Sequence, residues 1–366
     1  MKYPARDEYV RISGRCSQEN EGLFLGFSGS FVEFEMTGDE LKIGFVTDDP
    51  VMREDPNSEW YKPDISYCDE TYFGHAAVIV DGNYDSYTRI ALTTPELEAT
   101  VKLSSGRHII RVVKLNEAAF GCVGIAYIDI PGDIAPVPTK PLGKKIEFVG
   151  DSITCGYGNE GLNGVDIFTT SQQNPLDAYA IKTARKLNAE YQLVSWSGIG
   201  IISDYVDPSK NEPDETILMP VLYPYTDRRL DEKRKRELRK WDFAKYVPDV
   251  IVLFLGTNDA SYTRSIPERE EHMAREYAKF LEYLHEKNPT SDILAILGTM
   301  ETSLCATEEK VVESFAKAHP EIKAQFMALP LQDEADGLGA DSHPSKITHE
   351  KVATLVSEKL SKDFNL

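Results

Sequence analysis

The sequence predicts two domains of different classes, an all-β sandwich over residues 1–135 and an α/β domain with a parallel sheet over residues 145–366. Three observations lead to this prediction. At 366 residues the chain exceeds the size that one hydrophobic core usually organises. Apolar and polar residues tend to alternate along the first 130 positions. Beyond them, short apolar runs are separated by helical patterns.

The N-terminal part carries the period-two pattern of half-buried strands. In the run FVEFEM, Val32, Phe34 and Met36 fall on one face, and the two glutamates between them fall on the other. Signals for turns, in which glycine stands next to polar residues, occur at 37–39, 81–83 and 104–106. Many short strands joined by polar turns are typical of a β-sandwich.

A proline-rich segment marks the change of pattern. Residues 131–141 contain four prolines, which lack an amide donor and favour extended backbone, so we expect a connection between domains. The chain after it alternates between strand patterns and helix patterns, as is typical of a parallel sheet. Strands are predicted at 146–149, 191–196, 250–255, 293–297 and 324–329. Helices are predicted at 178–187, 269–286, 308–318 and 346–360, the last with Ser345 as its N-cap.

Charge and composition exclude several classes of function. Sixty acidic residues against 40 basic ones give a formal net charge of −20, so we expect no nucleic-acid partner and favour a neutral substrate. No apolar run approaches the roughly 20 residues that span a bilayer, which argues against a membrane protein. The first ten residues, MKYPARDEYV, lack the apolar region of a secretory signal, which predicts a cytoplasmic location.

Other conspicuous residues are interpreted as structural. The basic residues between 228 and 240 alternate with acidic ones, as in a solvated helix with ion pairs. The five cysteines occur singly, without a C-x-x-C pair, so we expect free thiols and no metal site; they are Cys16, Cys68, Cys122, Cys155 and Cys305. Four aromatic residues are interpreted as packing residues, with a sugar-binding wall as the alternative; they are Tyr205, Tyr223, Tyr225 and Trp241.

Residues that follow predicted strands are candidates for chemistry, because ligands of open α/β sheets bind at the carboxyl ends of strands. Gly150-Asp151-Ser152 follows the first strand, and its glycine permits a tight turn that exposes the Ser152 hydroxyl. Gly198 follows the second strand, where its amide can face a ligand. Asn258 follows the third strand, and its side-chain amide can donate to developing negative charge. Each of these signals is weak by itself.

A histidine and a carboxylate stand just before the last predicted helix. His343 is the side chain best able to accept a serine proton near neutral pH. Asp341 stands two residues before it and can orient the imidazole and stabilise the imidazolium. The alternative base is His349, but it falls inside the predicted helix and is interpreted as a surface or packing residue.

The four blocks in this order resemble the SGNH (GDSL-type) hydrolase superfamily over residues 145–366. The resemblance implies a flavodoxin-like parallel sheet with flanking helices and ester hydrolysis without metal or cofactor. Ser152 would be the nucleophile and His343 the general base. The Ser152 amide, the Gly198 amide and the Asn258 side chain would form the oxyanion hole.

The whole chain, including the stretch IEFVGDSITCGYG and the ending GADSHPS, is similar to carbohydrate esterase family 2. That similarity implies an N-terminal jelly-roll sandwich and acetylated xylan or its fragments as substrate. Asp341 would orient His343, although some members use a backbone carbonyl instead. Two positions depart from the pattern. Ala340 stands where the superfamily usually places its acid, and Ser342 stands where related esterases often carry an aromatic residue.

These inferences predict a serine esterase that removes O-acetyl groups from acetylated xylo-oligosaccharides through an acetyl-Ser152 intermediate. One alternative is a lipase or thioesterase of the same fold that acts on other short-chain acyl esters. Another is a carbohydrate-binding protein whose hydrolase half is inactive. The expected partner is an acetylated carbohydrate, and a homo-oligomer is left open. The acetylated sugar and hydroxyl position are not specified by the sequence.

Overall fold

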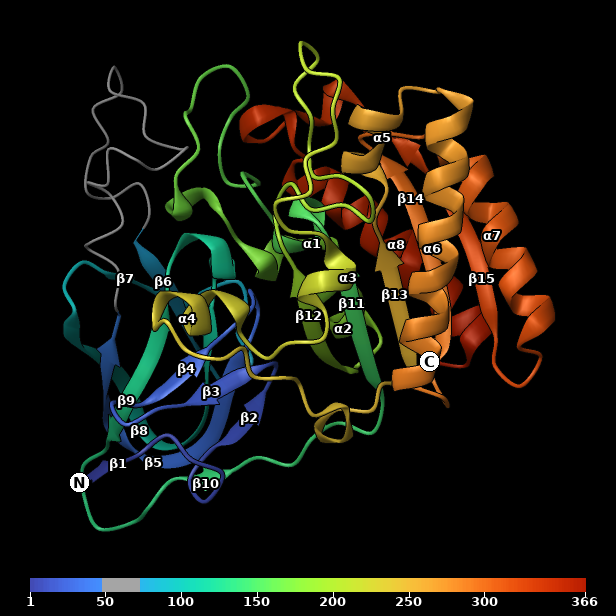
Figure 1. Cartoon of the computed structure of the whole chain (residues 1–366). Coiled ribbons are helices and arrows are strands. Elements are labelled where there is room, and N and C mark those ends of the chain that lie inside the picture. Colours follow the sequence, from blue (N-terminus) through green and yellow to red (C-terminus); the bar gives the residue numbers. More distant parts are fainter. Residues whose placement is uncertain (48–72) are drawn as a thin grey trace.

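In the computed structural model, which describes residues 1–47 and 73–366, the chain forms two sheets that lie side by side (Figure 1). Within these residues the first sheet is antiparallel and has ten strands. They are β1 Lys2–Tyr3, β2 Arg11–Ser13, β3 Cys16–Gln18, β4 Leu23–Leu25, β5 Phe31–Val46, β6 Gly74–Val80, β7 Thr88–Leu92, β8 Glu96–Lys114, β9 Val123–Asp129 and β10 Val137–Pro138.

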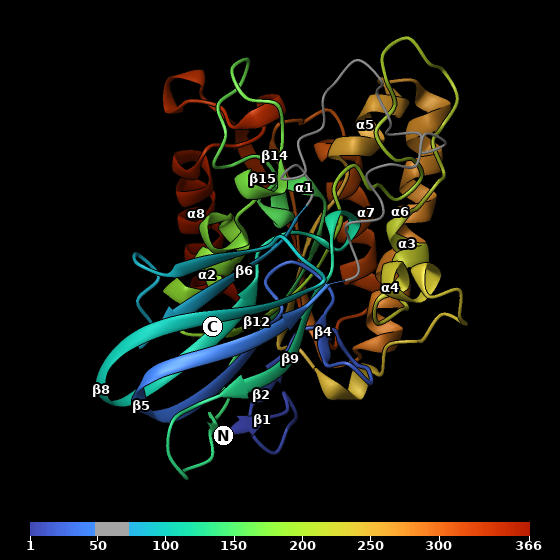
Figure 2. The same cartoon turned by 90° about the vertical axis from the view of Figure 1, so that its left-hand side faces the viewer.

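Two strands of this sheet are longer than the sequence predicted. β5 continues through 37–39 and β8 through 104–106, so the turns predicted at both places are wrong. Gly38 lies opposite Gly106, and the register shifts between Gly38 and Glu40. The paired glycines let both strands bend without ending. β5 and β8 therefore curl the sheet around its own core (Figure 2).

The alternation predicted for the N-terminal part is confirmed in β5. Val32, Phe34 and Met36 are all buried in the core that the curled sheet encloses. A turn forms where 81–83 predicted one, and there the Asn83 amide donates to the carbonyl of Val80 at 3.0 Å. Within the described residues the N-terminal half is therefore built around an antiparallel sheet, as expected.

The second sheet is parallel, and all five predicted strands are present. They are β11 Lys145–Gly150, β12 Glu190–Ser195, β13 Val250–Phe254, β14 Asp292–Thr299 and β15 Ala324–Leu331. Their order is β12-β11-β13-β14-β15, which is the flavodoxin-like order expected for the α/β domain. The order reverses at β11, so the crevice between the loops after β11 and β13 is where a ligand is expected.

Helices cover both faces of the parallel sheet, with α2 and α8 on one side and α6 and α7 on the other (Figure 2). The four predicted helices correspond to α2 Tyr179–Lys186, α6 Pro267–Lys287, α7 Cys305–Ala318 and α8 Lys346–Phe364. The predicted N-cap is confirmed, because the Ser345 hydroxyl accepts the Thr348 amide. Shorter helices are α1 Ser152–Cys155, α3 Met219–Leu222, α4 Arg228–Lys233 and α5 Thr257–Thr263.

The two sheets share one hydrophobic core. Phe27, Phe31, Ile79 and Val113 of the N-terminal half belong to the same buried cluster as the strands and helices of the parallel sheet. Alternation in β5 and β8 makes this arrangement possible, since successive side chains enter different cores. The part of the curled sheet that carries these four residues is thus an internal surface of the molecule.

The basic segment between 228 and 240 is only partly helical, because α4 ends at Lys233. The expected ion pairs are present. Arg236 pairs with Glu19 at 2.7 Å, and Arg239 pairs with the fully buried Asp231 at 2.8 Å. Glu19 follows β3 in the sequence, so the Arg236–Glu19 pair connects the N-terminal half to the second half, whereas the Arg239–Asp231 pair lies within the segment. The segment is therefore not a solvated face.

Two further expectations concern cysteines and membranes. Cys16, Cys155 and Cys305 are free thiols. Cys68 lies outside the described residues. Among the helices of the described ranges, none combines the length and apolar character that crossing a membrane requires.

Candidate active site

The nucleophile candidate stands at the reversal point of the parallel sheet. Ser152 follows β11 directly and begins α1, where it is nearly buried. Asp151 caps this helix, since its Oδ1 accepts the Ile153 amide at 2.9 Å. Gly150 is required by packing, because a Cβ there would overlap the Thr154 hydroxyl and lie 3.0 Å from the Phe254 carbonyl. The Gly-Asp-Ser sequence thus fixes a tight strand-to-helix turn.

The structure brings Ser152 and His343 together across 191 residues of chain. The His343 Nε2 lies 2.9 Å from the Ser152 Oγ. On the other side of the ring, Nδ1 lies 3.2 Å from the carbonyl oxygens of both Ala340 and Asp341. Carbonyl oxygens only accept hydrogen bonds, so they assign the proton to Nδ1 and leave the Nε2 lone pair facing Ser152. This is the tautomer that a general base requires.

Backbone contacts hold the two loops in register. The Ala340 amide donates to the Gly158 carbonyl at 2.9 Å, which joins the histidine loop to the chain after α1. A Cβ at Gly158 would lie 3.0 Å from Ala340 atoms, and its φ of 62° is in the left-handed region. Glycine is therefore needed for this close approach.

The Asp341 carboxylate has a hydrogen-bond partner other than the imidazole that it was expected to orient. Its Oδ2 accepts a hydrogen bond from the Tyr157 hydroxyl at 2.9 Å, and among the described residues no hydrogen bond joins it to His343. Asp341 has φ 51° and ψ 38°, and Ser342 has φ 62°. This left-handed turn directs the Asp341 carbonyl, rather than its side chain, at Nδ1. Burial lowers the pKa of His343 and is the larger effect. The charge of the Asp341 carboxylate acts in the opposite direction and raises this pKa.

Two of the three predicted oxyanion donors come from neighbouring elements, Gly198 from the loop after β12 and Asn258 from the first turn of α5. The Asn258 Nδ2 donates to the Ile199 carbonyl at 2.9 Å and lies 3.4 Å from the Asp151 Oδ2. Asn258 therefore stands between the residue after Gly198 and the residue before Ser152. Gly198 has φ 81°, a conformation that favours glycine. The structure thus gathers the glycine loop and the Asn258 side chain around the nucleophile turn.

A buried carboxylate from the N-terminal half holds the glycine loop, and the sequence did not reveal it. Glu117 is fully buried, and its Oε2 accepts the Ser197 amide at 2.6 Å. The Ser197 hydroxyl also donates to Glu117, and the Gln173 Nε2 donates to it at 3.0 Å. Burial raises the pKa of Glu117, and the Ser197 hydrogen bonds oppose that shift. No local pattern marks Glu117, because its partner is 80 residues away.

Two further buried acids lie beneath the site. Asp259 accepts the amides of Ile201 and Ile202 at 2.9 and 2.7 Å, which fixes the chain just after the glycine loop. Burial raises the pKa of Asp259 to about 6. Burial also raises the pKa of Asp151 to about 7, and the Asp259 charge adds to the shift. The Asn258-Asp259 pair therefore supplies one donor to the site and one support for its backbone.

An aromatic group beside His343 was also missed. The Tyr157 ring stacks on Phe168 with centroids 3.7 Å apart and lies 4.5 Å from the His343 ring. Phe120 of the N-terminal half packs 5.4 Å from Phe168. Of the aromatic residues considered from the sequence, Tyr223 is buried, whereas Tyr205 is 57% exposed. Only the Tyr-Gly-rich stretch after Ser152 offered a signal for this group.

The alternative base takes a structural position. His349 is buried in α8, and its Nδ1 accepts the Tyr179 amide at 3.2 Å. Burial lowers the pKa of His349 to about 3. Its position in the helix agrees with the packing role that the sequence suggested.

Comparisons with known proteins cover both halves of the chain. Residues 148–351 match the sequence profile of the GDSL-like lipase/acylhydrolase family. Cellulase/esterase CelE of Acetivibrio thermocellus is 33% identical over 288 residues, which cover 77% of this chain and 33% of that protein. An acetylxylan esterase / glucomannan deacetylase of Cellvibrio japonicus is 25% identical over 358 residues, or 97% of this chain and 89% of that one. The chain therefore spans about a third of CelE.

A solved structure extends the similarity to three dimensions. A family two carbohydrate esterase from Clostridium thermocellum, in complex with cellohexaose, superposes with a TM-score of 0.78 at 29% identity. The superposition covers 97% of this chain and 99% of that one. The curled antiparallel sheet is therefore part of the similarity, together with the parallel sheet.

Proposed function

The chain belongs to the GDSL-like lipase/acylhydrolase family, and from this premise we propose that it is a serine esterase that removes O-acetyl groups from acetylated sugars. Membership confirms the superfamily that the four motifs predicted and the carboxylic ester hydrolase class that follows from it. The observation that carries the proposal is the 2.9 Å separation of the Ser152 Oγ and the His343 Nε2.

The reaction follows from this geometry. Ser152 attacks the acetyl carbonyl while its proton passes to the His343 Nε2. Negative charge on the carbonyl oxygen is stabilised by the Ser152 and Gly198 amides and by the Asn258 side chain, each worth about 3 kcal/mol in typical sites. Collapse of the tetrahedral intermediate breaks the ester bond, and His343 returns the proton to the departing sugar oxygen. Water then attacks acetyl-Ser152 with His343 as base, which releases acetate and restores the serine.

We assign the orientation of His343 to the carbonyls of Ala340 and Asp341. Two acceptors on a strained turn hold the ring as a carboxylate would, but they add no full negative charge. Burial lowers the pKa of His343, which keeps the imidazole neutral and able to accept a proton. In this proposal the Asp341 carboxylate tunes the site through Tyr157 and through its charge.

The substrate class rests on the relatives and on the aromatic group. The names of the two curated relatives describe a cellulase/esterase and an acetylxylan esterase / glucomannan deacetylase. Sugars stack on aromatic rings, and the half-buried Tyr157 supplies such a ring beside His343. Exposed Tyr205 donates its amide to the Gly198 carbonyl at 2.9 Å and offers a second ring at the opposite loop. Acetylated oligosaccharides, including xylo-oligosaccharides, fit these features.

A second candidate is hydrolysis of esters with longer acyl chains. The loop after Gly161 exposes Leu162, Val165 and Ile167 at 60, 75 and 70%. This loop lies against the histidine turn, because the Ser342 amide donates to the Asn163 Oδ1 at 3.0 Å. An exposed apolar rim next to the base favours an acyl chain rather than a sugar.

We also propose that residues 1–135 form a jelly-roll half and residues 145–366 the catalytic half. Support comes from the two long strands, since β5 and β8 pair along most of their length and both line the core that the curled sheet encloses. Val137 and Pro138 still pair with β5, so the segment between the sheets begins in contact with the β-half.

Release of acetate tests the proposed function. The chain would be incubated with defined acetylated xylo- and gluco-oligosaccharides, and products would be measured by mass spectrometry. We expect loss of 42 mass units per acetyl group and at least about 10³-fold slower turnover for Ser152→Ala. Aryl esters of increasing chain length separate the two candidates. Faster hydrolysis of octanoate than of acetate would favour the lipase-like alternative, and undiminished activity of Ser152→Ala would overturn both.

A further inference from the structure

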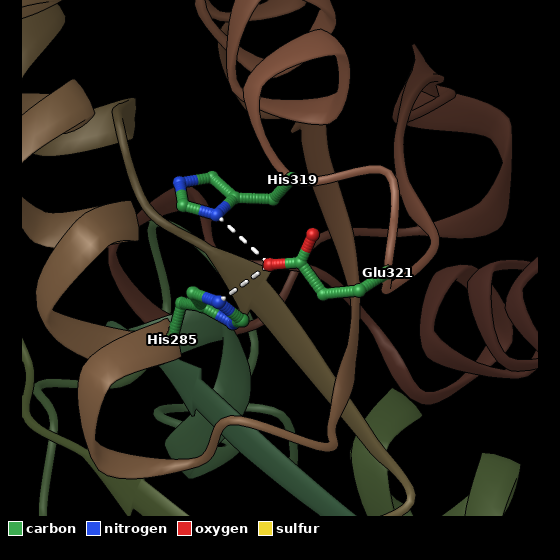
Figure 3. Close-up of side chains that lie close together, drawn as sticks. All are labelled: His285, His319 and Glu321. Carbon is green, nitrogen blue, oxygen red and sulfur yellow. Dashed lines mark hydrogen bonds and ion pairs between the residues drawn. The ribbon is translucent and has the colours of Figure 1, made fainter.

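A compact cluster of two histidines and one glutamate lies far from Ser152. His285 is in the last turn of α6, His319 follows α7, and Glu321 lies in the turn before β15. α6 and α7 each lead into the start of a parallel strand, whereas Ser152 follows the end of one. The cluster is therefore near the amino ends of the parallel strands, and Ser152 is at their carboxyl ends. Figure 3 shows the three side chains converging.

The donor atoms are already spaced as ligands of one ion. The Glu321 Oε1 lies 3.1 Å from the His285 Nε2 and 3.1 Å from the His319 Nδ1 (Figure 3). All three atoms lie within 4.8 Å of one another. Tetrahedral zinc with bonds of about 2.0–2.2 Å places neighbouring ligand atoms roughly 3.3 Å apart. Small side-chain adjustments would therefore bring one ion into bonding distance of the three groups.

A fourth residue supplies the outer contact that metal-binding histidines usually have. The Glu282 Oε2 lies 3.0 Å from the His319 Nε2, on the side of the ring that faces away from Glu321. A carboxylate at that nitrogen favours its protonation and leaves the Nδ1 lone pair for a metal. Glu282 is one helical turn before His285 in α6, so the same helix provides a ligand and a support.

Packing restricts both imidazoles while leaving the site accessible. The His285 and His319 rings lie 4.5 Å apart, and Phe315 packs 4.5 Å from His319 and 6.0 Å from His285. The histidine side chains are 15 and 20% exposed, whereas Glu321 is 54% exposed. An ion can enter from the Glu321 side, where water would complete its coordination.

We propose that His285, His319 and Glu321 bind one Zn²⁺-like divalent transition-metal ion. Two imidazole nitrogens and one carboxylate select zinc, cobalt or nickel over magnesium and calcium, which prefer oxygen ligands. The ion joins α6 to the turn between α7 and β15 and has no part in ester hydrolysis. No local pattern pointed to this metal site, because the two histidines are 34 positions apart and the sequence has no C-x-x-C pair.

Isothermal titration calorimetry with ZnCl₂ tests this site on the full chain, stripped with EDTA and prepared without a histidine tag. We expect one Zn²⁺ per chain and no comparable heat with MgCl₂. His285→Ala and His319→Ala should weaken Zn²⁺ binding at least 100-fold, and Glu282→Gln about tenfold. His272→Ala is the matched control, because His272 is also on α6 but is not part of the cluster. Its side chain is 43% exposed, and its contact with Glu276 is long, at 3.9 Å.

Two readouts keep the result interpretable. Aryl acetate hydrolysis should be unchanged in the four variants, which shows that each has folded and that the esterase site is independent. Bound Co²⁺ should give the intense visible absorption of tetrahedral coordination in the parent chain and lose it in His285→Ala. Absence of saturable Zn²⁺ binding, or equal binding by the parent and the His285→Ala variant, would reduce the cluster to ion pairs and overturn the proposal.

Discussion

The Glu117 carboxylate of the N-terminal half accepts the Ser197 amide at 2.6 Å, one residue before Gly198. The Ser197 hydroxyl and the Gln173 side chain also donate to it. Three donors thus converge on two carboxylate oxygens in a buried position. Because Gly198 is a proposed oxyanion donor, the β-half takes part in setting the geometry of hydrolysis without touching the substrate.

Replacing Glu117 with glutamine should affect the chemical step more than binding. The amide keeps one acceptor oxygen but turns an NH₂ group toward a donor, so the glycine loop shifts. We expect kcat to fall about tenfold and KM to stay nearly unchanged. Complete loss of one oxyanion donor lowers kcat by roughly 10²–10³-fold, so a displaced donor should cost less. Steady-state kinetics on an aryl acetate measure the changes in kcat and in KM separately. The control is Glu96→Gln, an exposed residue of β8. A change confined to KM would contradict the positioning role.

The Asp341→Asn variant distinguishes a carbonyl-oriented histidine from a triad. Neutralising a carboxylate that holds a catalytic histidine costs roughly 10⁴-fold in kcat. Here the carboxylate contacts the Tyr157 hydroxyl instead, so we expect less than about tenfold loss. Single-turnover measurements on an aryl acetate would record it, with Tyr157→Phe as the variant that removes the same hydrogen bond. A loss of several thousandfold would restore Asp341 to the triad.

The pH dependence of kcat/KM should reflect the half-buried His343. Only the neutral imidazole accepts the serine proton, and burial lowers its pKa below 6.5. Activity is therefore expected to rise with pH, reach half its maximum below pH 6.5 and stay level from pH 7 to 8. Asp341→Asn removes a charge that raises the pKa, so its midpoint should move further down. A midpoint above 7 in the parent enzyme would be inconsistent with this environment.

Glu308 predicts a pH-dependent change in stability. It is fully buried in α7, and burial together with the Asp259 charge raises its pKa well above the ordinary value. Because the pKa of Glu308 is higher in the folded state than in the unfolded state, its contribution to the free energy of unfolding depends on pH. This contribution is complete below the unfolded pKa of about 4.5 and is lost as pH rises through the folded pKa. Glutamine stays neutral at every pH.

We therefore expect Glu308→Gln to gain stability relative to the parent chain between pH 5 and pH 8. Urea unfolding at both pH values gives the two differences in free energy. Glu313→Gln, on the exposed side of the same helix, should show no such trend. If the Glu308 and Glu313 variants responded to pH alike, the buried acid would not be the cause.

Patterns local in the chain predicted most of the architecture. Each strand of the parallel sheet is a short apolar run, and parallel strands place their carboxyl ends at one edge, so Ser152, Gly198 and Asn258 could be expected near one another. His343 followed from its position before an amphipathic helix. These inferences succeed because both the element and its place in the sheet are encoded within about ten residues.

Other features depend on contacts between distant segments. The predicted turns at 37–39 and 104–106 are bends, because Gly38 and Gly106 pair across strands and neither signals that alone. Spacing placed Asp341 beside His343, but the left-handed backbone there turns its side chain toward Tyr157. Glu117 carried no signal at all, since its importance comes from a partner in the loop after β12.

The hydrophobic core that spans both sheets has a consequence for how this chain can be divided. Phe27, Phe31, Ile79 and Val113 lose their cover if the α/β half is removed, and the α/β half in turn exposes the apolar surface they cover. Each half would then expose a large apolar surface to water and would tend to aggregate. Such halves cannot be exchanged as independent modules during gene shuffling, so the pair is expected to be inherited, expressed and degraded as one unit.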